Sequence, residues 1–331
     1  MSRIKLFFFS KLGLVTTSIL LTFFLFAGGV EIYKRIEYNS WRADFLSQTD
    51  WFKKTTIQSP NEKLIWEYRP YGSAPQVGMN FNRYGYRDRD YETPKKPAGV
   101  YRIAFAGDSV TMGLLIKNTE DIFVRKFEKL VTKAQGSRKI QVLNFAVDGY
   151  NTIQVSEMIR QKVLPFEPDK IVYTMCLNDF DFITSAGNKM RLFRPPTSFF
   201  LFELHKIRRG LGGDDFHRFY FNQNRDDVFE DITHINSELT KKGVKYEVVI
   251  LPVFPVAPFH SNHFDGYPFH DIHKTLHDFL EKNKIPYVDM LPFFFRYKNI
   301  PLNQLAFDVW HPTVFGHRII AEALAKKLSL D

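Results

Sequence analysis

The chemistry of this 331-residue chain centres on a serine in the motif Gly107-Asp108-Ser109. The motif directly follows a short hydrophobic run at residues 101–106. A serine on a tight turn between a strand and a helix is well placed to act as a nucleophile, and the backbone N–H groups around it can stabilise an oxyanion. The alternative is that Ser109 only caps a helix.

A base for such a serine is offered near the end of the chain by Asp308-Val309-Trp310-His311-Pro312. An aspartate three residues before a histidine can bind one ring nitrogen and fix the tautomer, so that the other nitrogen faces a serine. A single Asp–His pair is more often an incidental surface contact. Its weight here comes from the other motifs in the chain.

Two further motifs follow hydrophobic runs in the same way. Gly149 comes after residues 139–147, and Asn178 comes after residues 170–176. A glycine lets the backbone turn sharply and present its N–H to a ligand, although it can equally be a simple turn residue. Because the carboxyl ends of parallel strands meet at one edge of a sheet, we expect these motifs to converge there.

The elements that would position these motifs alternate between strand and helix patterns. Strands are expected at 101–106, 139–147, 170–176, 246–253 and 286–290, and helices at 120–134, 152–164, 226–242, 268–283 and 313–328. This alternation predicts an α/β fold, a three-layer α/β/α domain with a central parallel sheet of about five strands.

Residues 12–30 form a run of nineteen residues without a charge. As a helix this run would be roughly 28 Å long, close to the hydrocarbon thickness of a bilayer. Basic residues precede it without an acidic one, so the positive-inside rule predicts a signal-anchor with residues 1–11 in the cytoplasm. A cleaved signal peptide is the alternative, because Ala27-Gly28-Gly29 supplies small residues, but the run is longer than a usual signal core.

The composition argues against several other classes of protein. The net charge of +9 comes from 45 basic and 36 acidic residues, and no run of Lys or Arg exceeds two. A nucleic-acid-binding protein would concentrate that charge on one element, so no nucleic-acid partner is expected. The single cysteine, Cys176, excludes an intrachain disulfide framework and a Cys-based zinc site.

In type and order the motifs resemble those of the SGNH hydrolase superfamily, the GDSL-type esterases and lipases, over roughly residues 99–328. The resemblance implies a flavodoxin-like SGNH fold and a catalytic triad of Ser109, Asp308 and His311. It also implies an oxyanion hole formed by the backbone N–H of Ser109 with Gly149 and Asn178. It implies no metal and no cofactor. One position departs from the family pattern, because a cysteine precedes the asparagine block where a glycine is usual.

The segment at 82–88 also resembles the motif that precedes the catalytic domain in membrane-anchored bacterial members of this family. We expect it to pack against the main domain. The expected organisation is therefore a cytoplasmic N-terminus (1–11), a transmembrane segment (12–30), an extracytoplasmic extension (31–98) and an SGNH domain (99–331).

Two regions have no clear place in this scheme. An aromatic and basic insertion at 184–223 could be a lid, a membrane-facing surface or a docking element, or it could simply complete the core. Five histidines lie further along the chain: His260, His263, His270, His273 and His277. The last three of these are at helical spacing. Such a spacing could bind zinc or nickel, although the resemblance requires no metal.

The resemblance and the anchor together imply a serine esterase in the cell inner membrane. It would be single-pass, with a periplasmic catalytic domain. The expected substrates are O-acyl esters, foremost O-acetyl, of an envelope glycan or lipid. The alternative is an O-acyltransferase that passes the same acyl group to a cell-envelope polysaccharide, beside a multi-spanning membrane acyltransferase. A catalytically silent glycan-binding scaffold is the third hypothesis, and an intact Ser/Asp/His set argues against it.

Overall fold

The computed structural model describes residues 11–48, 50–135, 138–181, 196–208, 216–254 and 266–330. The chain divides into two compact units. One comprises Met1–Asp50 with Arg194–Asp214, and the other comprises Trp51–Phe193 with Asp215–Asp331. The larger unit contains the sheet and all four motifs.

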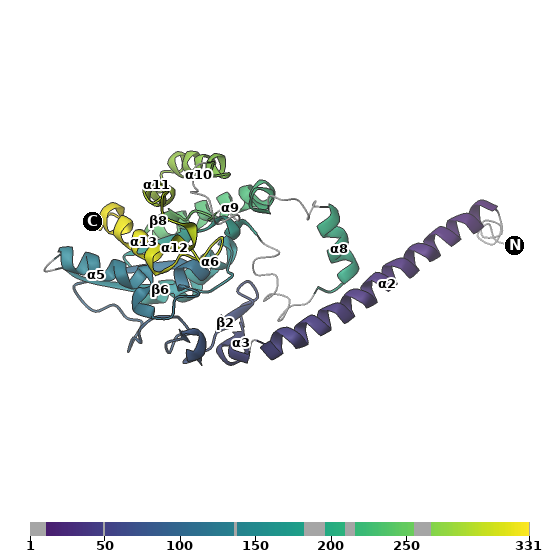
Figure 1. The fold of residues 1–331 in the computed structure, drawn as a ribbon, viewed down its shortest axis with the longest axis horizontal. Coiled ribbons are helices and arrows are strands. Elements are labelled where there is room, and N and C mark those ends of the chain that lie inside the picture. Colours follow the sequence, from purple (N-terminus) through teal and green to yellow (C-terminus); the bar gives the residue numbers. More distant parts are fainter. Residues whose placement is uncertain are drawn as a thin grey trace. The chain divides into compact units, whose positions relative to one another are not determined.

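A five-stranded parallel sheet forms the centre of the larger unit (Figure 1). Its strands are β5 (Val100–Gly107), β6 (Lys139–Ala146), β7 (Lys170–Met175), β8 (Lys245–Ile250) and β9 (Tyr287–Asp289). They lie in the order β6-β5-β7-β8-β9, which is the flavodoxin-like order. Every residue of β7 is buried, as expected for a strand covered by helices on both faces. The predicted fold class is confirmed.

Helices cover both faces of this sheet. The helices are α5 (Phe123–Gln135), α6 (Thr152–Met158), α9 (Phe216–Lys241), α10 (His270–Lys282) and α13 (Val314–Lys327). The chain moves one way across the sheet from β5 to β6 and then the other way from β6 to β9, so right-handed connections place α5 opposite α6, α9 and α10. The final helix, α13, packs against α5.

The register of the strands brings their carboxyl ends to one edge. Gly107 pairs with Ala146 on one side and with Thr174 on the other, and Ile250 pairs with Asp289. Gly107 must be a glycine, because a Cβ there would lie 2.4 Å from the hydroxyl oxygen of Thr111. The close approach of β5 to the turn that follows it therefore depends on the absence of a side chain.

Residues 56–80 form two short antiparallel hairpins within the larger unit. They pair β1 (Thr56–Gln58) with β2 (Trp66–Tyr68), and β3 (Ser73–Ala74) with β4 (Met79–Asn80). The following 82–88 motif packs against the sheet domain, as expected. Its Arg87 donates hydrogen bonds to the carbonyl oxygens of Gly113 and Ile116.

The aspartate that ends this motif is also tied to the sheet domain. Asp88 is buried, accepts the backbone N–H of Asn144 at 2.8 Å and lies 3.3 Å from the guanidinium of Arg125. Asn144 belongs to β6 and Arg125 to α5, so one carboxylate links the extension to a strand and a helix. The motif therefore has a structural role in holding the extension.

The smaller unit contains α2 (Lys11–Gln48) and α8 (Phe199–Arg208). Within the described residues, α2 is the one helix long and apolar enough to cross a membrane. A signal sequence at the N-terminus would meet the same criterion. The helix continues well beyond residue 30, so the polar residues after the apolar run are helical as well.

Two predicted helices differ from the observed ones. The helix expected from 226 begins ten residues earlier, at Phe216, in a stretch whose aromatic residues have only modest helix propensity. The helix expected over 152–164 ends as regular α-helix at Met158 and continues as a π-helical turn, Ile159–Val163. A proline at position 165 stands in the 3₁₀ turn that follows.

A buried histidine in α13 makes the stability of the fold sensitive to acid. His317 is 1% exposed, and its Nδ1 accepts the backbone N–H of Phe123 at 3.1 Å. Burial lowers its pKa to about 3, from 6.5. Between these two values the unfolded chain binds a proton that the folded chain does not, so the free energy of unfolding falls as the pH falls.

We therefore expect His317→Asn to reduce the pH dependence of stability, because an asparagine oxygen can also accept the Phe123 N–H but does not titrate. Between pH 7 and pH 5 the wild type should lose about 2 kcal/mol more free energy of unfolding than the variant. Urea unfolding of the full chain in detergent measures this difference. Identical losses in both proteins would show that His317 does not stay neutral in the fold.

Candidate active site

Ser109 is the first residue of α4 (Ser109–Met112), directly after β5. The residue that caps this helix is Asp108, whose carboxylate accepts the backbone N–H of Val110 at 3.0 Å. The helix cap is therefore the neighbouring aspartate, and this excludes the interpretation of Ser109 as a mere cap. The serine hydroxyl instead lies 2.9 Å from Nε2 of His311.

His311 is held in one orientation by Asp308. Its Nδ1 lies 2.7 Å from one carboxylate oxygen of Asp308 and 2.9 Å from the other. Asp308 also accepts the backbone N–H groups of Trp310 and His311, so a tight turn positions the carboxylate. In this arrangement Nδ1–H donates to Asp308, and Nε2 is left to accept the hydroxyl proton of Ser109.

The charge on Asp308 follows from the same contacts. Partial burial raises the pKa of this carboxyl, but the hydrogen bond and charge of His311 outweigh it, and the net pKa is lowered. Asp308 therefore remains a carboxylate at neutral pH. A negative charge beside Nδ1 stabilises the imidazolium that would form when the ring takes a proton.

Asn178 lies against the turn that carries the serine. It belongs to a short 3₁₀ helix, Leu177–Phe180, directly after β7. Its side-chain amide donates to Asp108 Oδ2 at 3.0 Å. Asp108 is completely buried, which raises its pKa, while the bonds from Asn178 and Val110 lower it in part. Asn178, which the sequence analysis singled out, therefore forms a hydrogen bond to the residue directly before Ser109.

Gly149 lies in the turn that follows β6. Its φ of 72° is in the left-handed region, which favours glycine. The residues on either side are held by the N-terminal hairpins, because Tyr68 donates to Asp148 at 2.9 Å and Tyr150 donates to the carbonyl oxygen of Trp66. The hairpins therefore hold this turn in place. The spacing of the motifs alone does not predict that contact.

The position before the asparagine block, where the family usually has glycine, is filled by a buried cysteine. Cys176 donates its backbone N–H to Asp179 at 3.2 Å, and the hydroxyl of Tyr173 donates to the same carboxylate at 2.7 Å. Burial raises the pKa of the Cys176 thiol well above its ordinary value. It packs as a small apolar residue, and Asp179, which sequence reasoning did not single out, holds the turn.

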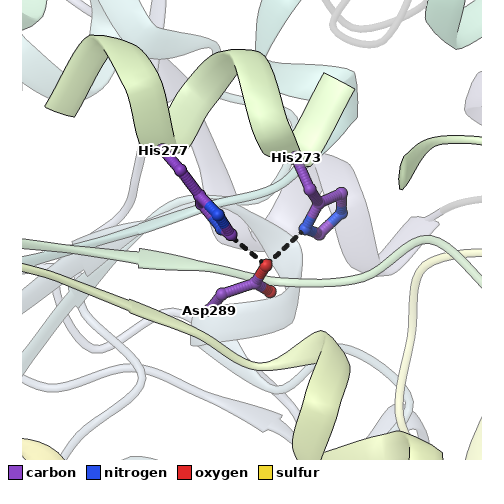
Figure 2. A group of neighbouring side chains, drawn as sticks. All are labelled: His273, His277 and Asp289. Carbon is purple, nitrogen blue, oxygen red and sulfur yellow. Dashed lines mark hydrogen bonds and ion pairs between the residues drawn. The ribbon is translucent and has the colours of Figure 1, made fainter. Parts of the chain in front are cut away.

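A second cluster, His273, His277 and Asp289, joins α10 to β9 (Figure 2). Nδ1 of His273 and Nε2 of His277 lie 2.9 and 2.8 Å from the same oxygen of Asp289. Potential ligand atoms of the three residues lie within 4.8 Å of one another, as a metal ion would require. The other nitrogen of His273 lies 3.1 Å from the hydroxyl of Tyr267.

These contacts also have a purely structural explanation. The hydrogen bonds from His273 and His277 to Asp289 lower the pKa of this carboxyl, despite the burial that raises it. His273 is buried. His270 is exposed and stacks on Phe295. His260 and His263 lie outside the described residues, as do residues 184–195 and 209–215 of the aromatic insertion.

The chain is similar to a known protein family and to several solved structures. A family model described as GDSL-like lipase/acylhydrolase matches residues 103–324. No curated protein matches the chain. Among solved structures, a catalytic mutant of Axe2, an acetylxylan esterase from Geobacillus stearothermophilus, is 16% identical with a TM-score of 0.48, over 70% of this chain and 95% of that chain.

Two more solved structures show a similar level of likeness. LAE5, an alpha/beta hydrolase enzyme from the metagenome of Lake Arreo, Spain, is 18% identical with a TM-score of 0.46, over 70% of this chain and 96% of that chain. The acetyl xylan esterase AlAXEase is 17% identical with a TM-score of 0.47, over 69% of this chain and 100% of that chain.

Proposed function

The chain belongs to the GDSL-like lipase/acylhydrolase family of SGNH ester hydrolases, and from this premise we propose that Ser109 is its nucleophile, His311 its general base and Asp308 the acid that orients the base. One observation carries the proposal. The Ser109 hydroxyl and Nε2 of His311 lie 2.9 Å apart although the residues are separated by 202 positions. The helix cap is supplied by Asp108, and the Ser109 hydroxyl lies closer to His311 Nε2 than to the Asp108 carboxylate, which is 3.5 Å away.

In the acylation step, His311 takes the hydroxyl proton as Ser109 Oγ attacks the ester carbonyl carbon. A tetrahedral intermediate forms, and its collapse breaks the bond to the alcohol oxygen. His311 returns the proton to the departing alcohol, and the acyl group remains on Ser109. Asp308 keeps Nδ1–H in place and stabilises the imidazolium between the two proton transfers.

The negative charge of the intermediate would be stabilised by the backbone N–H groups of Ser109 and Gly149 and by the side-chain amide of Asn178. The first N–H groups of a helix have no partner within the helix, and Ser109 stands at that position in α4. An amide nitrogen carries two hydrogens, and Asp108 accepts one of them. That bond would orient Asn178 toward the oxyanion.

We expect Asn178→Ala to lower kcat by roughly 100- to 1,000-fold, because the donor acts on charge that develops in the transition state. KM should change far less. Steady-state hydrolysis of a short-chain aryl ester measures both constants. The matched control is Asn224→Ala, which removes another buried amide that donates to the carbonyl oxygen of Phe180 in the same turn.

The control variant should keep kcat within a few-fold of wild type even where it loses stability. Equal losses in the two variants would mean that Asn178 supports the turn and has no role in the transition state. Wild-type kcat in Asn178→Ala would exclude it from the oxyanion hole.

In the second half of the reaction, water would attack the acyl-serine with His311 as base, and the acid would be released. The alternative acceptor is a sugar hydroxyl, which would make the protein an O-acyltransferase with the same intermediate. The acyl-serine intermediate and the triad are the same for water and for a sugar as acceptor, so they do not distinguish the two reactions. We propose hydrolysis first because family membership supports an ester hydrolase. Membership of an ester-hydrolase family also disfavours a silent glycan-binding scaffold.

The choice between water and sugar is tested by incubating the purified full chain with an acetyl ester in the presence of candidate envelope glycans. Hydrolysis predicts free acetate in proportion to the alcohol released, whatever the glycan. Transfer predicts acetylated glycan and a matching deficit of acetate. Mass spectrometry of the glycan and an acetate assay together distinguish the two.

We further propose that α2 anchors the protein in the inner membrane as a single pass, with the hydrolase domain in the periplasm. Support comes from the uncharged run at 12–30, whose large apolar side chains are exposed along α2, and from the basic residues before it. This location suggests an acylated glycan or lipid of the envelope as substrate.

A reporter fused after Asp331 should be active only in the exported compartment, and cytoplasmic reporter activity would contradict the location.

A further inference from the structure

The helix α8 is attached to α2 directly after the apolar run. The carboxylate of Glu31, one residue beyond that run, accepts the Ser198 hydroxyl at 3.0 Å and the backbone N–H of Phe200 at 2.9 Å. Arg35, one turn further along α2, donates to the carbonyl oxygen of Thr197 at 2.9 Å. The Ser198 hydroxyl oxygen in turn accepts the backbone N–H of Leu201 at 3.2 Å, so Ser198 caps α8 locally while Glu31 adds a stabilising negative charge and attaches the start of α8 to α2.

Two aromatic residues of α8 contact α2 on either side of the point where its apolar run ends. The ring of Phe200 packs edge-on against Phe23, which lies inside the run, with ring centres 5.8 Å apart. The preceding ring, Phe199, contacts Tyr38 and the guanidinium of Arg35, which lie beyond the run. The start of α8 thus lies beside the point where α2 changes from apolar to polar. Figure 1 shows α8 next to α2.

One face of α8 is apolar and exposed. Leu201 is 62% exposed and Leu204 is 49% exposed. Leu204 is four positions after Phe200 and three after Leu201, so it lies next to both of them on the surface of α8. Glu203, by contrast, lies 4.0 Å from Lys34 on the polar part of α2. Isolated exposed leucines are ordinary, but these continue the exposed apolar surface of α2.

We propose that α8 is a second membrane-associated element that lies at the bilayer surface beside α2, with Phe200, Leu201 and Leu204 inserted among the acyl chains of the same leaflet. Amphipathic helices at an interface bury their apolar face about 5–10 Å below the headgroups. The connection of α8 to β7 and α9 in the chain would then tie the hydrolase domain to the membrane at a point besides the anchor. This inference rests on the proposed anchoring of α2.

The test uses the full chain with single cysteines labelled by a polarity-sensitive fluorophore and reconstituted into vesicles of equal parts phosphatidylcholine and phosphatidylglycerol. The native Cys176 is completely buried, which protects it from the label. Leu204→Cys reports on the proposed apolar face, and the control is Glu203→Cys, about 100° further around the same helix and beside Lys34 on the polar part of α2. Leu21→Cys, inside the apolar run and exposed, reports on the anchor itself.

We expect the label at Leu204→Cys to show blue-shifted emission, and to be quenched more by nitroxide lipids labelled near the headgroup than by lipids labelled near the chain end. Leu21→Cys, about 14 Å inside the run, should show the reverse order. Emission from Glu203→Cys should remain water-like.

The outcomes separate the two levels of the proposal. Water-like emission at Leu204→Cys together with quenching at Leu21→Cys would overturn the interfacial role of α8 and leave the anchor intact. The absence of lipid quenching at both positions would overturn the anchor and, with it, this inference. Equal quenching at Leu204→Cys and Glu203→Cys would mean that α8 is fully immersed, which contradicts a surface position.

Discussion

Replacing Ser109 with alanine is expected to abolish ester hydrolysis, with kcat lowered by about 10⁴- to 10⁶-fold. The change removes the oxygen that forms the acyl-enzyme, and no neighbouring group can substitute for a covalent nucleophile. The small cavity left by one hydroxyl group should leave folding intact, because the helix cap is supplied by Asp108. Hydrolysis of a short-chain aryl ester by the full chain in detergent measures the effect.

The matched control is Ser156→Ala, which deletes the hydroxyl of another buried serine, in α6 on the other side of the sheet from α5. Its kcat should remain within a few-fold of wild type. Substantial activity in Ser109→Ala, with Ser156→Ala also active, would show that another residue is the nucleophile.

Replacing His311 with alanine should have an effect of the same order, because an unassisted hydroxyl is a poor nucleophile at neutral pH. The serine and histidine act as one unit, so a double variant should be hardly worse than either single variant. Asp308→Asn should cost up to about 10⁴-fold, since asparagine favours the wrong tautomer of His311. The same assay, with kcat compared across the three variants, measures this pattern.

His277→Ala provides a histidine control, because His277 is also paired with an aspartate, Asp289, but lies in the second cluster. Its kcat should match that of wild type. Loss of activity in His277→Ala with retention in His311→Ala would move the chemistry from the serine site to the His273–His277–Asp289 cluster.

Much of the sheet domain is predictable from the sequence because its signals are local. Continuous apolar runs such as 170–176 indicate buried parallel strands, and the carboxyl ends of such strands meet at one edge. This argument already places Ser109 and Asn178 near each other. It does not place His311, which follows no strand in the sheet; the spacing of Asp308 and His311, together with the resemblance of their motif to a known family, assigned it.

The parts that could not be predicted depend on contacts between distant residues. No spacing indicates that Tyr68 will hold Asp148, or that Arg87 will reach the carbonyl oxygens after α4. His273 looks like one of several surface histidines in the sequence and becomes buried because Tyr267 and Asp289 surround it. The helix α8 has a local cap in Ser198, but its attachment to Glu31, 169 residues away from Phe200, is a contact that no local pattern can reveal.

The central claim, that Ser109 is the acylated nucleophile, is tested most directly by labelling the full chain with a fluorophosphonate and mapping the adduct by peptide mass spectrometry. The account predicts one rapidly formed adduct, on the peptide that contains Ser109, and its loss in His311→Ala, where the hydroxyl is no longer activated. A stoichiometric adduct on a different serine, or unchanged labelling of Ser109 without His311, would contradict it.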